Sequence, residues 1–77
     1  MKYFHYKIDN NEVSEYNGEI PSIPPGFIQY KVGLAGESVY YNLANEELTD
    51  VISEGIHEDA ARRGLEEFLS AFYVSLV

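Results

Sequence analysis

The chain has 77 residues, enough for one small domain, and its 13 Asp and Glu against 5 Lys and Arg give a formal net charge of -8. Hydrophobic residues make up 45% and aromatic residues 14%, which excludes an intrinsically disordered chain. Cysteine is absent, which excludes disulfides, thiol catalysis and cysteine metal sites and favours a cytoplasmic protein.

The first 43 residues predict two β-hairpins. Apolar and polar residues alternate over residues 2–8, a turn signal follows at 9–11, and residues 13–16 return as a short second strand. Residues 27–33 and 37–43 alternate again on either side of a Gly-containing turn, which predicts the second hairpin. With this phase the side chains expected in the core are Phe4, Tyr6, Ile8, Ile28, Tyr30, Val32, Val39, Tyr41 and Leu43.

Residues 17–26 separate the two hairpins and contain three prolines. Proline has no backbone N–H to donate to a sheet, so this segment is expected to be a surface loop with extended character.

The remainder of the chain predicts two helices. Asn45 is a suitable N-cap, Leu48, Val51 and Ile52 form an apolar stripe, and Gly55 suits the C-terminal stop. A second helix is expected from His57 or Glu58 toward residue 76, with an apolar stripe of Ala61, Leu65, Phe68, Leu69, Phe72 and Leu76. The predicted fold is one α+β domain over residues 1–77, β-rich in 1–43 and helical in 44–77. It has three or four antiparallel strands followed by two helices packed on one face.

Acidic residues are concentrated in the second half, where residues 34–77 hold nine acids against two arginines. Glu46, Asp50 and Glu54 are spaced by four and would share one face of the first predicted helix, with Glu47 beside them. That helix would contain no Lys or Arg. The row is interpreted either as a binding surface for a basic partner or as a solvated face that aids solubility.

The outer face of the predicted sheet is the second candidate surface, and it combines Tyr3, His5, Lys7, Lys31 and Tyr40. Aromatic rings beside basic residues can stack the bases of single-stranded RNA, but a net charge of -8 repels nucleic acid. The same face could instead be a protein interface or lie under the proline-containing loop. The apolar run 72–77 is expected either to dock into the core or to make a dimer contact.

Signatures of catalysis and metal binding are lacking. His57-Glu58 begins like a zinc-protease helix, but Ala61 stands where the second histidine would have to be. The glycines form no phosphate-binding loop, and no apolar run approaches the length of a membrane span. We therefore expect no enzyme activity, no metal and no cofactor.

These observations predict a small acidic, non-catalytic binding protein of the cytoplasm. It would inhibit or modulate a larger nucleic-acid-handling protein by occupying a basic surface, without binding nucleic acid itself, through Glu46, Glu47, Asp50 and Glu54. In size and charge the chain resembles phage- and plasmid-borne inhibitors of bacterial defence, such as anti-CRISPR and anti-restriction proteins, which implies a host cytoplasm. The resemblance covers composition and architecture alone. The alternatives are a homodimeric interaction or assembly module, and a nucleic-acid or small-ligand binder that uses the aromatic sheet face.

Overall fold

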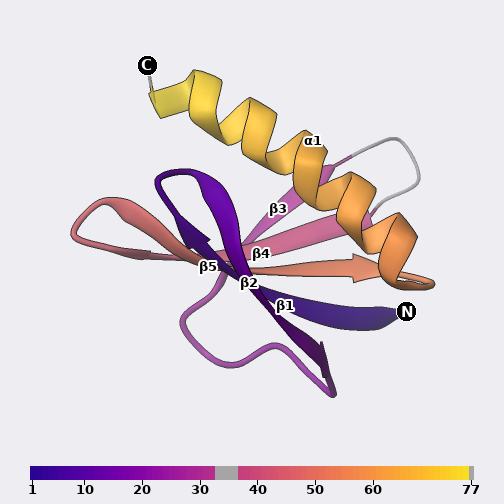
Figure 1. Ribbon diagram of the computed structural model, residues 1–77. Helices are drawn as coiled ribbons and strands as arrows, with labels where there is room; N and C mark the ends of the chain where they lie inside the picture. Colours follow the sequence, from indigo (N-terminus) through magenta and orange to yellow (C-terminus); the bar gives the residue numbers. More distant parts are fainter. Residues whose placement is uncertain (33–36, 77) are drawn as a thin grey trace.

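The protein is a five-stranded antiparallel sheet with one helix lying across one of its faces (Figure 1). The computed structural model describes residues 1–32 and 37–76, with the side chains of 72–76 outside the description. The elements are β1 (Lys2–Asp9), β2 (Glu12–Ile20), β3 (Ile28–Val32), β4 (Glu37–Ala44), β5 (Glu47–Gly55) and α1 (Glu58–Leu76). Their order in the sheet is β2-β1-β5-β4-β3, which places β5 in the middle.

The α+β class is confirmed, but the predicted helix after Asn45 is wrong. Residues 47–55 form the central strand β5, so the sheet has five strands, and a single helix begins at Glu58. Asn45 and Glu46 have φ angles of 53° and 67° and connect β4 to β5 as a two-residue turn. Positive φ at both central residues is what a type I′ hairpin turn requires. Asn45 is therefore a turn residue and not a helix cap.

The first hairpin is longer than the sequence predicted. The turn at Asn10 and Asn11 is confirmed, and both residues have positive φ, but β2 runs over nine residues. Its pairing with β1 shifts twice, which leaves Ser14 and Asn17 as extra residues on β2. Such bulges increase the local twist of a strand.

The second predicted hairpin is confirmed as β3 and β4. They pair without a register shift from Ile28↔Tyr41 to Val32↔Glu37. The Gly-containing turn between them lies outside the described residues.

The proline-containing segment 21–27 connects the two opposite edges of the sheet, because β2 and β3 are its outer strands. Figure 1 shows this segment passing on the face of the sheet that is opposite to α1. Ile52, which by strand alternation points to that face, is only 1% exposed. The sheet is therefore covered on both faces, by the helix on one side and partly by this loop on the other.

The core lies between α1 and the sheet. Phe68 and Leu65 are fully buried, as the helical stripe predicted, while the predicted stripe residues Phe72 and Leu76 have side chains outside the description. The helix packs on side chains from four of the five strands, and the buried cluster comprises Phe4, Tyr6, Ile8, Val32, Val39, Leu48, Val51, Ala61, Leu65 and Phe68.

Three of the expected core positions lie at its periphery. Ile28 is 50% exposed, and Tyr30 and Leu43 are also largely exposed. Tyr30 still faces the helix, since its ring meets the ring of Phe68 edge-on at 5.3 Å between centroids. The predicted phase of β3 is thus correct, but β3 is an outer strand and α1 leaves it partly uncovered.

The start of α1 is fixed tightly against β5. His57 acts as the helix N-cap, since its Nδ1 accepts a hydrogen bond from the N–H of Ala60 at 3.2 Å. The hydroxyl of Ser53 donates to the carbonyl of Ala61 at 2.6 Å, within the buried core. Gly55 is required at this junction, because a Cβ there would lie 2.6 Å from the backbone nitrogen of Ala61.

Candidate functional site

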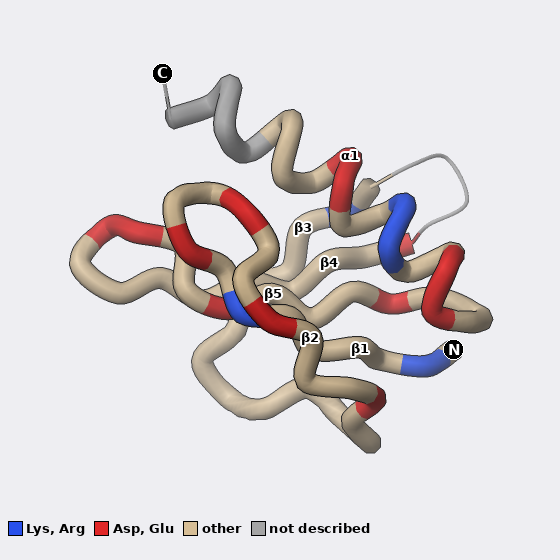
Figure 2. The backbone as a smooth tube through the Cα atoms, viewed as in Figure 1, with Lys and Arg blue, Asp and Glu red and all other residues tan. Residues whose placement is uncertain are grey.

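Two hairpin turns lie side by side at one end of the sheet. The β1–β2 turn and the β4–β5 turn meet there because β1 and β5 are antiparallel neighbours, with Lys7 opposite Asp50 just before the turns. Figure 1 shows both turns projecting from the same end, and Figure 2 shows acidic residues in each of them.

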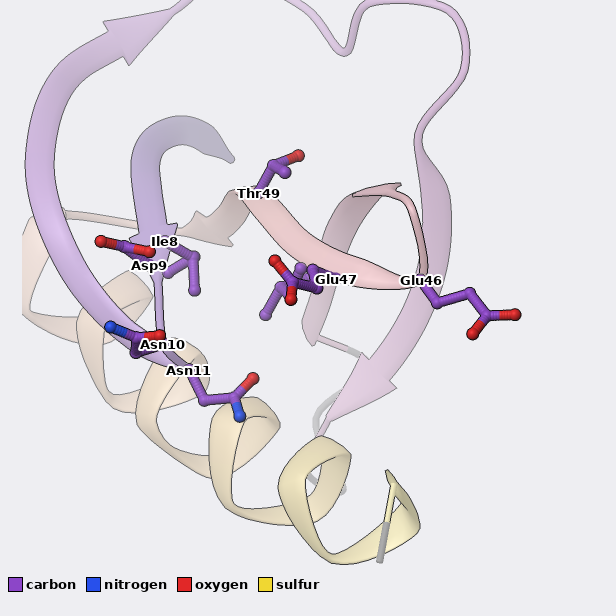
Figure 3. A pocket seen from close by; sticks show the side chains of 8 residues that line it. Ile8, Asp9, Asn10, Asn11, Glu46, Glu47 and Thr49 are labelled. Atoms are coloured by element: carbon purple, nitrogen blue, oxygen red, sulfur yellow. The ribbon is translucent and has the colours of Figure 1, made fainter.

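A pocket of about 220 Å³ lies between these turns. Its floor contains two buried apolar side chains, Ile8 and Leu48. Its polar lining is Asp9, Asn10, Asn11, Glu46, Glu47 and Thr49, and we call this group the acidic turn pocket. Figure 3 shows Asp9 and the two asparagines on one side and Glu47 on the other, while the Glu46 carboxyl extends away from them.

The acidic turn pocket is rich in negative charge. Three carboxylates line it, no Lys or Arg does, and Glu12 adds a fourth carboxylate directly opposite Asp9 in the hairpin. The ion pairs formed by the described side chains lie elsewhere and centre on Asp50. Carboxylate, amide and hydroxyl oxygens can all accept hydrogen bonds from a cation, so the pocket suits an ammonium or guanidinium group.

The predicted acid row does not exist as one surface. Glu46 lies in the turn, Asp50 in the middle of β5, and Glu54 near its other end, opposite Tyr3. A spacing of four residues that covers one turn of a helix spans most of a strand. Of the four predicted partner-binding acids, the structure brings only Glu46 and Glu47 together.

Asp50 was expected to have no basic neighbour, and this expectation is wrong. Nε2 of His5 donates to Oδ1 of Asp50 at 2.9 Å, and Nζ of Lys7 lies 3.5 Å from the same oxygen. Burial alone would raise the pKa of Asp50, but hydrogen bonds from His5 and Thr49 and the charge of Lys7 outweigh it and lower the pKa. Asp50 therefore stabilises the fold instead of offering a free charge.

The aromatic sheet face is confirmed as a shared face but is only partly open. The pairing registers place Tyr3, His5, Lys7, Lys31 and Tyr40 on the side of the sheet away from α1. The rings of Tyr3 and Tyr40 meet edge-on at 6.2 Å and are half-buried, and burial raises the pKa of the Tyr40 hydroxyl. Stacking of nucleic-acid bases requires exposed ring faces, so this packing disfavours that use.

The sequence interpretation missed Asp9, Asn10 and Asn11. A signal was present, since two short Asn-containing segments are each bordered by acids, but the pairing of β1 with β5 is needed to bring them together.

No family model, curated protein or solved structure matches the chain. Within residues 1–32 and 37–76, no helix is long and apolar enough to cross a membrane. The same part of the chain contains no group of three or more His, Asp or Glu arranged to hold a metal ion.

Proposed function

We propose that this chain is a non-catalytic binding protein that engages a basic surface of a larger, nucleic-acid-handling protein and thereby inhibits or modulates it. The observation that carries the proposal is the acidic turn pocket, where two turns distant in sequence present carboxylates around a concave site. This pocket replaces the predicted acid row as the contact surface.

The dimensions of the pocket suit one side chain of a partner. At about 220 Å³ it is smaller than the sites of drug-sized ligands, which occupy about 300–1,000 Å³. An inserted Arg or Lys would pack its aliphatic stem against Ile8 and Leu48 and direct its charge toward Asp9 and Glu47. The asparagines and Thr49 supply further acceptors.

Charge would act on the rate of association more than on affinity. Exposed ion pairs contribute about 0–1 kcal/mol each, so three rim carboxylates do not by themselves produce tight binding. A net charge of -8 accelerates encounter with a basic surface and repels nucleic acid, which carries the same sign. Binding should therefore weaken as salt is added.

The first experiment is an NMR titration of the labelled protein with an oligo-arginine peptide at two ionic strengths. We expect shift changes concentrated at residues 8–11 and 46–49, reduced at the higher ionic strength. Changes spread evenly over the acidic side chains of α1 would contradict a specific role for the pocket.

The second experiment compares two triple variants that remove the same charge. Asp9→Asn, Glu46→Gln and Glu47→Gln neutralise the pocket, whereas Asp59→Asn, Glu66→Gln and Glu67→Gln neutralise exposed acids of α1. Only the first should lose the peptide response by ten-fold or more, and only the first should fail to retain the cellular partner in affinity capture. Equal losses would reduce the effect to net charge.

A further inference from the structure

The two edges of the sheet are unlike each other. β2 and β3 each leave one row of backbone N–H and C=O groups unpaired. Along β2 the row is interrupted by bulges at Ser14 and Asn17, and Glu12, Glu15 and Glu19 lie along the strand. Bulges and charges are devices that block edge-to-edge pairing. β2 is therefore a protected edge.

β3 lacks these protections. Its five residues pair with β4 without a register shift, and its sequence, Ile-Gln-Tyr-Lys-Val, contains no acid and one base. Ile28 and Tyr30 are both substantially exposed on the side of the sheet that carries α1. A regular outer strand with exposed apolar side chains is a template for pairing with another strand.

We propose that β3 pairs antiparallel with β3 of a second copy of this chain, joining the two sheets into one. Such a contact is two-fold symmetric, so each residue meets the residue at the mirrored position. Centred on Tyr30, it sets Ile28 against Val32 of the second copy and Gln29 against Lys31, and it uses all five residues. Centring on Lys31 would place two lysines directly opposite each other, and centring on Gln29 would pair only three residues.

Electrostatics favours the same edge. Two copies that each carry -8 repel one another, so association is easiest where acids are fewest. β3 has none, and the acid closest to it in the pairing register is Glu37, opposite Val32 on β4. Pairing through β2 would instead bring two sets of three glutamates together.

This dimer goes beyond the binding function proposed above and uses a different surface. It also has the opposite response to salt. Salt screens the repulsion between two acidic copies and should strengthen dimerisation, whereas it should weaken binding to a basic partner. The two proposals can therefore fail independently. Five residues a side are far fewer than the roughly 20–30 of a standard interface, so the dimer should be weak and must be sought at high protein concentration.

The test is sedimentation equilibrium over a wide range of protein concentration. The average mass of the wild type should rise from that of one chain toward that of two. Ile28→Lys should weaken dimerisation at least ten-fold, because it places a charge beside Val32 and Lys31 of the second copy. Ile56→Lys is the matched control, since Ile56 is exposed and lies outside the sheet. It makes the same chemical change and should dimerise as the wild type does.

Amide hydrogen exchange locates the interface independently. The β3 amides that do not bond to β4 should gain protection as the protein concentration rises, and those of β2 should not. A wild type that stays monomeric at every concentration would overturn the proposal. So would dimerisation that Ile28→Lys leaves unchanged, or protection that appears along β2.

Discussion

The hydroxyl of Tyr6 gives the sharpest test of the packing between α1 and the sheet. Tyr6 is fully buried in the middle of β1, and its ring lies 5.1 Å from the ring of Tyr16. No described donor or acceptor lies within hydrogen-bond distance of its oxygen. Tyr6→Phe removes this oxygen and keeps the ring in place.

The expected effect is stabilisation. Leaving a buried polar group without a partner costs about 1–3 kcal/mol, and phenylalanine does not incur that cost. The variant also loses the contacts of one atom, which offsets part of the gain. We therefore expect Tyr6→Phe to raise the free energy of unfolding at neutral pH by about 1–2 kcal/mol. An ordinary core substitution lowers it.

The advantage of the variant should grow in alkali. Burial, and secondarily the charge of Glu58, raises the pKa of Tyr6 from 10.0 to about 12 in the folded state. Above pH 10 the unfolded chain releases this proton while the folded protein retains it, so the wild type loses stability as pH rises from 10 to 12. The loss is about 1.4 kcal/mol for each pKa unit. Tyr6→Phe lacks this contribution.

The assay is urea unfolding of both proteins at pH 7 and pH 11, with the m-value as a check that the same surface unfolds. Tyr16→Phe is the control at neutral pH, because Tyr16 is largely exposed and its change should stay within about 0.5 kcal/mol. A Tyr6→Phe protein less stable than the wild type at pH 7 would refute the reasoning, since the hydroxyl would then have a stabilising partner.

Three further predictions concern the same core. Phe68→Ala should lower the free energy of unfolding by about 3–5 kcal/mol, measured by urea unfolding, because Phe68 is fully buried against four strands of a small domain. Gly55→Ala should destabilise, because its Cβ would collide with the backbone of Ala61, whereas Gly64→Ala meets only ordinary contacts at 3.5 Å and should be neutral or up to about 1 kcal/mol more stable. Melting temperatures that fall equally in both glycine variants would contradict this contrast. Asp50→Asn should destabilise at pH 7 but much less in acid, because the lowered pKa of Asp50 provides stability above its unfolded value of 3.8 that is lost as pH falls through the folded value. A stability difference that does not change between pH 7 and pH 2 would show that the ionised carboxylate contributes nothing.

The error over residues 46–55 has a specific physical origin. Leu48, Val51 and Ile52 have the spacing of a helical stripe, yet they belong to a strand. Leu48 and Val51 share the helix-facing core although three residues separate them, because Thr49 is an extra residue where the register with β4 shifts. Ile52 points to the other face, where it is buried as well. A bulge and burial on both faces removed the alternation that identifies a strand.

The candidate site could not be predicted for a related reason. The Asn10–Asn11 turn was evident from the sequence, since asparagine tolerates positive φ. A second turn at Asn45–Glu46 was concealed by the apparent helix, because Glu46 at φ 67° is not a residue expected in that conformation. With β5 read as a helix, nothing indicated that the two turns were neighbours.

The sequence by itself determined the local features: the α+β class, the β1–β2 turn, the β3–β4 hairpin, and a final helix whose buried face includes Leu65 and Phe68. These depend on periodicity and turn chemistry, which act over a few residues. Only the tertiary structure decided that residues 47–55 form the central strand, that Asp50 is held by His5 and Lys7, and that the turns enclose one acidic pocket. Each of these depends on β5 inserting between β1 and β4. Such an insertion is selected by burial of both faces of that strand against side chains distant in the sequence, and not by the intrinsic preference of its own residues.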